Sequence, residues 1–254
     1  MLRILAVAPI LFACCLGLPD HPSNRILDGV DTDAESYTYM ASVEYNKNHR
    51  CAGSIISYNW ILTVAHCVHG LDTELLRVRS AFVIPIRGLM GKVSAVNSTI
   101  LHPYFDFKTL DYDIALINTA DDLYDVNGTD TNIHIGLRLP LDGNSATVFG
   151  WGARIIGTWF TKFLTNQTLT IVYFNECKYS YESVGNPVTE RMFCAGLVGG
   201  GPCQGDSGDP LIYGNRLIGM MSWSYGCGER RFPAVFTDVT QFRFWIESTA
   251  GILL

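Results

Sequence analysis

Short apolar runs separated by turn-forming residues are the feature that most limits what this chain of 254 residues can fold into. Long stretches with the spacing of an amphipathic helix are scarce, and Gly, Asn, Asp and Pro interrupt the apolar segments at short intervals. The clearest runs are Ser54–Ile56, Trp60–Val64, Ile114–Ile117, Ala146–Phe149 and Leu217–Trp223. This pattern predicts an all-β fold, either a sandwich or a barrel.

Two segments favour a helix instead. Ala65–Val68 predicts a short helical turn, and the end of the chain predicts a helix that covers one side of the body. The apolar residues of that last helix are Val239, Phe242, Phe244, Trp245 and Ile246. A boundary at residues 140–145 would divide the chain into halves of similar size, although the halves show no strong sequence repeat.

The composition supports a large folded body and excludes two classes of partner. Hydrophobic residues make up 48% of the chain and charged residues only 17%, which provides a sizeable core and argues against wholesale disorder. The net charge is -6, from 18 basic and 24 acidic residues, and no long basic run occurs. We therefore expect no nucleic-acid partner and no binding to an anionic membrane.

The N-terminus has the pattern of a secretory signal peptide. Arg3 precedes an apolar run from Ile4 to Leu18 that only Pro9 interrupts, and the small residue Gly17 predicts cleavage that removes residues 1–17. The alternative, a membrane anchor, needs a longer apolar run to cross a bilayer, and no later segment of the sequence supplies one. The sequence therefore predicts a secreted, extracellular protein.

Secretion indicates that the cysteines of the mature chain form disulfides. Two of the eight, Cys14 and Cys15, leave with the signal peptide. The six that remain are Cys51, Cys67, Cys177, Cys194, Cys203 and Cys227. An even number of cysteines in an exported protein predicts disulfides, but the residues alone leave the pairing open. A metal site needs closer clusters of cysteine and histidine, so we expect no metal and no cofactor.

Three Asn-x-Ser/Thr triplets are candidate glycosylation sites. They begin at Asn97, Asn127 and Asn166. Such triplets are short and occur often by chance, so each stays a candidate.

Ser207 and His66 together suggest a serine made nucleophilic by a histidine. Ser207 lies in Gly205-Asp206-Ser207-Gly208, and His66 lies far upstream in Thr63-Val64-Ala65-His66-Cys67. Each segment by itself also fits a tight turn or a packed histidine. Acyl transfer by serine additionally needs a carboxylate to orient the base and donors for the developing oxyanion.

The sequence offers candidates for both the orienting carboxylate and the oxyanion donors. Asp113 lies directly before the apolar run Ile114–Ile117, where its carboxylate would sit at the mouth of a buried strand and orient His66. The backbone amides of Gly205 and Ser207 would form the oxyanion hole. An esterase or lipase of the α/β class is an alternative, but its Gly-x-Ser-x-Gly elbow lacks a final glycine here and the β-rich pattern disfavours that fold.

These segments resemble the signatures of the chymotrypsin/trypsin family of secreted serine proteases, over nearly the whole mature chain. Trp60–Cys67 resembles the histidine signature and Asp111–Leu116 the aspartate signature, and the order His66, Asp113, Ser207 is that of the family. Further similar landmarks are Gly150-Trp151-Gly152, Ser222-Trp223 and Phe232–Phe236.

The resemblance implies the architecture. It implies two packed antiparallel six-stranded β-barrels with a C-terminal helix, His66 and Asp113 coming from the first barrel and Ser207 from the second. It also implies one disulfide pairing: Cys51 with Cys67, Cys177 with Cys194, and Cys203 with Cys227.

The resemblance also implies activation by proteolysis. Residues 18–25 would be an activation peptide, and cleavage after Arg25 would free the α-amine of Ile26 at the start of a protease domain spanning 26–254. In the family this amine pairs with the aspartate before the catalytic serine, here Asp206, because a buried carboxylate needs a partner. That ion pair orders the oxyanion hole, so proteolysis acts as a switch.

The specificity pocket departs from that of trypsin. By resemblance Gly201 lies at the pocket base, where trypsin-like members carry an aspartate, and a cation entering there would lose hydration without compensation. The remaining substrate-binding positions are Ser222, Trp223, Ser224 and Ala234. We expect a chymotrypsin- or elastase-like preference for Leu, Met or Phe. Cleavage after Arg or Lys is the alternative, if the Gly-rich run shifts register or Glu229 supplies a remote acid.

Asp209 is a second departure, because the family has glycine there. If the backbone needs a positive φ, aspartate strains it; if the side chain faces the cleft, it opposes an anionic transition state. A catalytically weak or inactive homologue that binds partners is therefore a further alternative. Otherwise the expected partners are protein or peptide substrates, an activating protease and protein inhibitors, and a monomer is expected.

Overall fold

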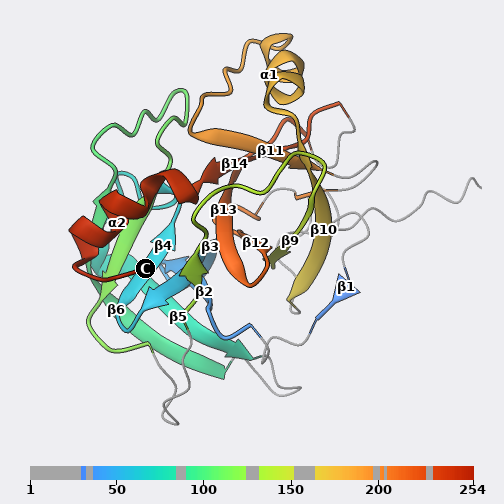
Figure 1. Cartoon of the computed structure of the whole chain (residues 1–254). Coiled ribbons are helices and arrows are strands. Elements are labelled where there is room, and N and C mark those ends of the chain that lie inside the picture. Colours follow the sequence, from blue (N-terminus) through green and yellow to red (C-terminus); the bar gives the residue numbers. More distant parts are fainter. Residues whose placement is uncertain are drawn as a thin grey trace, which may run out of the picture.

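The computed structural model describes eight stretches of the chain (Figure 1). They are residues 30–32, 37–83, 90–123, 132–151, 164–196, 201–202, 205–226 and 231–254. The predicted signal and activation segments, with Arg25 and Ile26, lie outside these residues, as do Asn127, Cys203, Cys227 and Glu229.

Six strands form a first closed barrel in the order β2-β3-β4-β7-β6-β5 (blue to green in Figure 1). All neighbouring strands in it run antiparallel. The strands are β2 (Met40–Tyr45), β3 (Asn48–Ser57), β4 (Trp60–Thr63), β5 (Leu76–Val83), β6 (Met90–Leu101) and β7 (Ala115–Thr119).

A second set of six antiparallel strands forms the other barrel, in the order β10-β11-β14-β13-β12-β9, and pairing of β9 with β10 closes it. The strands are β9 (Ser145–Gly150), β10 (Thr165–Val172), β11 (Met192–Gly196), β12 (Pro210–Tyr213), β13 (Arg216–Trp223) and β14 (Ala234–Asp238). Two short strands add to it: β1 (Val30–Asp31) on β10, and β8 (His134–Ile135) parallel to β13. The prediction of two six-stranded antiparallel barrels is confirmed.

Burial along the strands follows the two patterns typical of β structure: β14 is buried at all five positions, whereas burial alternates along β10. In β10 the residues that face inward are Thr165, Gln167, Leu169 and Ile171, at the period of two that a strand imposes. Leu169 and Ile171 join a core cluster with residues of β9, β11, β13 and β14. The core of the first barrel continues into Leu217 and Met220 of β13, so the two barrels share a packed boundary.

The helices are partly as predicted. Ala65–Cys67 forms a short 3₁₀ helix, and Thr73–Leu75 forms another. At the chain end a 3₁₀ turn (Val239–Phe242) leads into α2 (Arg243–Ala250), whose Ile246 packs in the core of the first barrel. The inclusion of Phe244 in the covering face was wrong: its side chain is 82% exposed, because the helix turns it away from Phe242 and Ile246.

The helix α1 (Phe174–Glu182) was not predicted. Only two of its residues, Cys177 and Tyr181, are buried, so its apolar stripe is too narrow to stand out in the sequence. Its first half is held to β11 by the disulfide Cys177–Cys194. A second disulfide, Cys51–Cys67, joins β3 to the 3₁₀ helix that carries His66. Both pairs are those that the family resemblance implies.

Across the described ranges, none of the helices has the length and apolar character needed to span a bilayer. Two sequons fall inside these ranges. Asn97 is exposed on β6, where its amide donates to Asn118 Oδ1 at 3.3 Å. Asn166 is half-buried on β10 and pairs with Phe149 of β9.

Candidate active site

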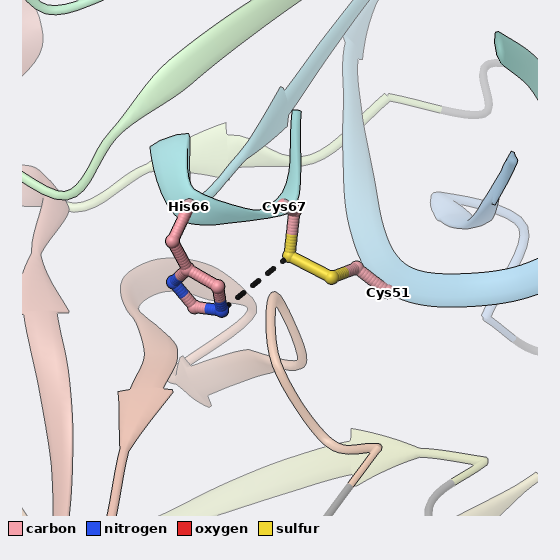
Figure 2. Close-up of side chains that lie close together, drawn as sticks. All are labelled: Cys51, His66 and Cys67. Atoms are coloured by element: carbon pink, nitrogen blue, oxygen red, sulfur yellow. Dashed lines mark hydrogen bonds between the residues drawn. A yellow bond between two sulfur atoms is a disulfide. The ribbon is translucent and has the colours of Figure 1, made fainter. Parts of the chain in front are cut away.

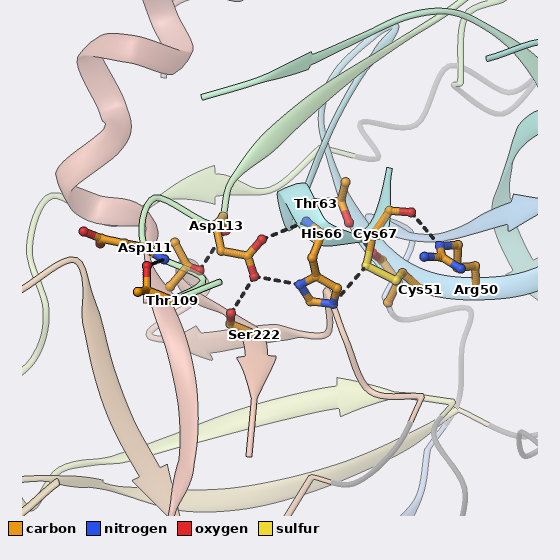
Figure 3. Close-up of polar contacts among 11 residues, drawn as sticks. Arg50, Cys51, Thr63, His66, Cys67, Thr109, Asp111, Asp113 and Ser222 are labelled. Carbon is orange, nitrogen blue, oxygen red and sulfur yellow. Dashed lines mark hydrogen bonds and ion pairs between the residues drawn. A yellow bond between two sulfur atoms is a disulfide. The ribbon is translucent and has the colours of Figure 1, made fainter. Parts of the chain in front are cut away.

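His66 and Asp113 form the centre of the site (Figure 3). The ring Nδ1 of His66 donates to Asp113 Oδ2 at 2.7 Å, and the backbone NH of His66 donates to Asp113 Oδ1 at 2.9 Å. The side chain of Asp113 is fully buried, whereas that of His66 is 20% exposed. The double contact fixes the orientation of the imidazole. Because it uses Nδ1 and the backbone NH, the other ring nitrogen, Nε2, can accept or donate a proton.

The pairing of β4 with β7 explains why these two residues meet. Its register sets Thr63 opposite Ala115. The chain beyond Thr63 turns into the 3₁₀ helix that carries His66, and the chain before Ala115 carries Asp113, so both side chains lie at the same end of one strand pair. The disulfide from Cys67 to Cys51 of β3 holds the histidine turn in place.

The second barrel completes the surroundings of Asp113. The hydroxyl of Ser222, at the end of β13, donates to Asp113 Oδ2 at 2.5 Å, and Thr237 of β14 donates to the backbone carbonyl of Asp113 at 2.8 Å. A buried carboxylate is stable only when hydrogen bonds replace its hydration. Asp113 therefore accepts hydrogen bonds from residues of both barrels. Ser222 was expected to bind substrate, but its hydroxyl binds this carboxylate instead.

Ser207 lies on the loop before β12, against the first barrel. Its carbonyl accepts from the NH of Ala52 on β3 at 2.9 Å. Gly205 and Gly208 have φ of 94° and 83°, the left-handed region that glycine adopts without strain. A Cβ at Gly208 would lie 2.1 Å from the carbonyl oxygen of Ala52. Glycine on both sides of Ser207 thus permits the close approach that brings this loop to the site.

His66 and Ser207 are not hydrogen-bonded to one another. Within the ranges that the structure covers, Nε2 of His66 has one polar contact, to Cys67 Sγ at 3.7 Å (Figure 2). The backbone NH groups of Gly205 and Ser207 donate to no carbonyl of another described residue, whereas those of Gly208 and Asp209 do.

Cys51, His66 and Cys67 bring their ligand-type atoms within 4.8 Å of one another (Figure 2). The two sulfur atoms are bonded to each other, however, and the form of cysteine that binds metal is the thiolate. The chemistry of this donor set therefore does not fit a metal ion.

Four of the predicted pocket residues lie where β13 ends and β14 begins: Ser222 and Trp223 end β13, Ser224 follows it, and Ala234 is the first residue of β14. Gly201 and Ala234 are buried, and Trp223 and Ser224 are half-buried. Pairing of Trp223 with Val235 places Ser224 beside Ala234. The hydroxyl of Ser224 donates to the carbonyl of Gly226 at 2.9 Å. None of these residues carries a charge, and the side chains of Ser224 and Ala234 are small.

Asp209 meets neither of the conditions under which it would disturb the site. It is not among the residues with positive φ, and its side chain is buried, pointing at Gly150 of β9 rather than into a cleft. Burial, and then the neighbouring carboxylate of Asp206, raise the pKa of Asp209 well above its usual value. The protonated form of Asp209, which can donate to Asp206, is therefore favoured.

Replacing Gly150 by Ala is expected to destabilise the protein by about 1–3 kcal/mol. The added Cβ would lie 1.6 Å from Asp209 Oδ2, so one of the two must move. Urea unfolding, measured in a Ser207→Ala background to prevent self-digestion, checks this. In an Asp209→Ala background the cost of Gly150→Ala should largely disappear. An equal cost in both backgrounds would contradict the contact.

His49 was not singled out from the sequence, because no motif contains it. Its Nδ1 lies 2.7 Å from the hydroxyl of Ser42, and its Nε2 is buried. Burial lowers the pKa of His49 to about 4, although a hydrogen bond to the backbone of Gly205 acts in the opposite direction. A neutral histidine therefore supports the loop that carries Ser207.

The family of this chain follows from comparison with known proteins. The model of the family described as Trypsin matches residues 26–246. The chain belongs to this family, whose fold and disulfide pairs agree with the structure, and it is a serine endopeptidase.

Several curated relatives are trypsins of insects. Trypsin epsilon of Drosophila erecta is 34% identical over 98% of this chain and 99% of that protein. Trypsin alpha-4 of Lucilia cuprina is 35% identical over 92% of this chain and 91% of that protein. Hypodermin-B of Hypoderma lineatum is 33% identical over 92% of this chain and 91% of that protein.

Proposed function

We propose that this chain is a secreted endopeptidase in which Ser207 is the nucleophile, His66 the general base and Asp113 the orienting carboxylate. The observation that carries the proposal is the pair of hydrogen bonds from His66 to the buried Asp113, at 2.7 and 2.9 Å. They hold the ring with Nδ1 protonated, so Nε2 is the nitrogen that accepts a proton. Substrate binding would bring Ser207 Oγ and His66 Nε2 into hydrogen-bond contact.

The reaction proceeds in two halves. Ser207 Oγ bonds to the substrate carbonyl carbon while its proton passes to His66 Nε2, and the C–N bond then breaks as that proton passes to the leaving amine. Water next bonds to the acyl carbon while its proton passes to His66 Nε2, and the bond between that carbon and Ser207 Oγ then breaks as His66 returns the proton to Oγ. The amides of Gly205 and Ser207 stabilise the oxyanion in both halves, since no described carbonyl occupies them.

Activation follows removal of residues 1–17 and cleavage after Arg25, which leaves a protease domain of residues 26–254 with its halves divided near 140–145. The amine of Ile26 would pair with Asp206, whose side chain is completely buried next to Ser207. A cation entering there compensates a buried negative charge, so the pairing favours the ordered loop. We expect the processed enzyme to be a monomer.

The specificity we propose is for uncharged residues, because Gly201 places no acid at the pocket base. Leu, Met or Phe before the scissile bond fit a pocket narrowed by Ser224 and Ala234. The trypsin names of the relatives favour the alternative, cleavage after Arg or Lys. Under that alternative a carboxylate other than residue 201 would bind the cation.

Labelling with a fluorophosphonate tests the assignment of Ser207. The processed chain should take up about one phosphonate per molecule on Ser207, with loss of fluoride, because only an activated serine reacts at this rate. The Ser207→Ala variant and the chain not cleaved at Arg25 are the controls, and both should react far more slowly. Equal slow labelling of all three proteins would favour an inactive homologue that binds partners.

A further inference from the structure

A second buried carboxyl group lies beside that of Asp206 and has no part in the proposed reaction. Asp206 is 0% exposed and Asp209 is 1% exposed. The NH of Asp209 donates to the carbonyl of Asp206 at 2.9 Å, so a single tight turn brings the two residues together. Gly208, with φ of 83°, allows that turn. The two carboxyl groups are within hydrogen-bond contact of each other.

Within the described ranges, the surroundings of Asp209 supply no donor that could stabilise a negative charge on its side chain. Neither side-chain oxygen accepts a hydrogen bond there. Strand β9 faces the carboxyl group with Gly150, which has no side chain, and β13 meets Asp209 through the NH of Met221, which donates to its backbone carbonyl at 2.9 Å. A buried carboxylate without donors or a cation is strongly disfavoured, so Asp209 keeps its proton.

A protonated Asp209 can donate to the carboxylate of Asp206. Burial, and then the charge of Asp206, hold the pKa of Asp209 well above its usual value, in agreement with this arrangement. His49 of β3 contacts the backbone of Gly205 in the same turn, but burial lowers its pKa to about 4 and keeps it neutral. The two carboxyl groups therefore share one negative charge at neutral pH, and the proton of Asp209 replaces part of the hydration that Asp206 lost on burial.

This hydrogen bond acts on the segment of residues 205–209 that carries Ser207, here called the Ser207 loop. Asp206 directly precedes Ser207, whose carbonyl accepts from the NH of Ala52 of β3 at 2.9 Å. A carboxylate stays in the interior only when a donor or a cation compensates it. The amine of Ile26 would be such a partner for Asp206 after cleavage. Asp209 is a partner that is already present before cleavage.

We propose that Asp209 is a positioning residue: its proton bonds to Asp206 and holds the Ser207 loop in its ordered form before the activating cleavage. The inference rests on the proposed function for the roles of Ser207 and of cleavage. An ordered loop gives the uncleaved chain a low activity that depends on pH. This activity should fall as Asp209 ionises, since two negative charges then face each other in the interior.

The rate of labelling by a fluorophosphonate tests this in the uncleaved chain, kept intact by Arg25→Gln. The chain should label more slowly than the processed enzyme, but at least about tenfold faster than the same chain with Asp209→Ala. Asp209→Asn should label like the native residue at low pH, because its amide donates to Asp206 at every pH. As pH rises, the native rate should fall relative to that of Asp209→Asn, and this ratio is independent of the titration of His66.

A matched control separates the loss of the proton from the loss of volume. Asp209→Ala leaves a gap, and Gly150→Ala fills it, since the added Cβ would lie 1.6 Å from the position of Asp209 Oδ2. The double variant should still label as slowly as Asp209→Ala. Labelling of the double variant as fast as the native chain would overturn the proposal, because packing alone would then hold the loop.

The pH dependence of stability tests the proton without any enzyme activity. In the uncleaved Ser207→Ala chain, the stabilisation from the proton of Asp209 is complete below the pKa of the unfolded carboxyl group. It is lost as pH rises toward the higher pKa of the folded one. Relative to Asp209→Asn, the folding equilibrium constant from urea unfolding should fall about tenfold per pH unit over that interval. Parallel curves for the two chains would overturn the proposal, because Asp209 would then be ionised at neutral pH.

A failure of the proposed function would be distinguishable from a failure of this inference. If the processed chain took up no phosphonate, that function would fail, and amide hydrogen exchange in the uncleaved chain would decide the inference. The NH groups of Ala52 and Gly208, bonded to the carbonyls of Ser207 and Met221, should exchange faster in Asp209→Ala than in the native chain. Equal exchange in the two chains would contradict the positioning role.

Discussion

Replacing Asp113 by Asn is expected to lower kcat about 10⁴-fold, the size typical of this substitution in a Ser-His-Asp triad. Asn preserves the shape of the side chain, but its NH₂ group cannot accept from His66 Nδ1 in the way the carboxylate oxygen does at 2.7 Å. The imidazole would then adopt the other tautomer, and Nε2 would carry a proton and be unable to accept one from Ser207. Steady-state kinetics of the processed variant on a peptide amide measures the loss.

Ser222→Ala provides the comparison for that experiment. It removes one donor to Asp113 Oδ2 and leaves both contacts of His66 in place. A loss of about tenfold is expected, which is the size of a single hydrogen bond to a charged group. If Asp113→Asn lost no more activity than Ser222→Ala while remaining folded, Asp113 would not be the carboxylate that orients the base.

Replacing Gly201 by Asp is expected to reverse the preference of the enzyme. A carboxylate at the pocket base would pair with an incoming guanidinium or ammonium group, whereas in the native pocket that cation is buried without a partner. The ratio of kcat/KM for an Arg substrate to that for a Leu substrate should rise by at least about 100-fold. Peptide amides that differ only at this residue measure the ratio.

Gly201→Asn is the matched control, since it adds nearly the same volume without a charge. It should lower activity on Leu and Phe substrates and give no gain on Arg. A ratio that stays constant in Gly201→Asp would show that residue 201 does not lie at the base of the pocket. It would favour the alternative in which another residue of the Gly-rich run 199–201 occupies that position.

The β-rich class of the fold was predictable because its determinants are local, whereas the two-barrel architecture was predicted through the family resemblance. Short apolar runs such as Ala146–Phe149 and Leu217–Trp223 appear in the structure within β9 and β13. Six consecutive residues of β13 are buried, and a short continuous apolar run is the sequence pattern of such a strand. The meeting of His66 with Asp113 was predictable only through the family resemblance. The physical cause, the register of β4 on β7, depends on a pairing that no single segment encodes.

What remained hidden depends on tertiary contacts between distant residues. Ser222 gives no sequence sign that its hydroxyl binds Asp113, which lies 109 positions away. Arg191 forms an ion pair with Asp111 from 80 positions away, and no motif contains Arg191. Asp209 looked disruptive in the sequence because a glycine was expected there, yet the absence of a side chain at Gly150 gives its carboxyl group room in the interior.

Cleavage of peptide amides by the chain processed after Arg25 is the most direct test of the proposed triad and of the neutral specificity pocket. The substrates differ only in the residue before the scissile bond, which is Leu, Phe, Ala or Arg, and Ser207→Ala serves as the blank. We expect the Leu and Phe substrates to be cleaved and the Arg substrate not to be cleaved. Preferred cleavage after Arg would contradict the neutral pocket, and the absence of any turnover above the Ser207→Ala blank would contradict the proposed triad.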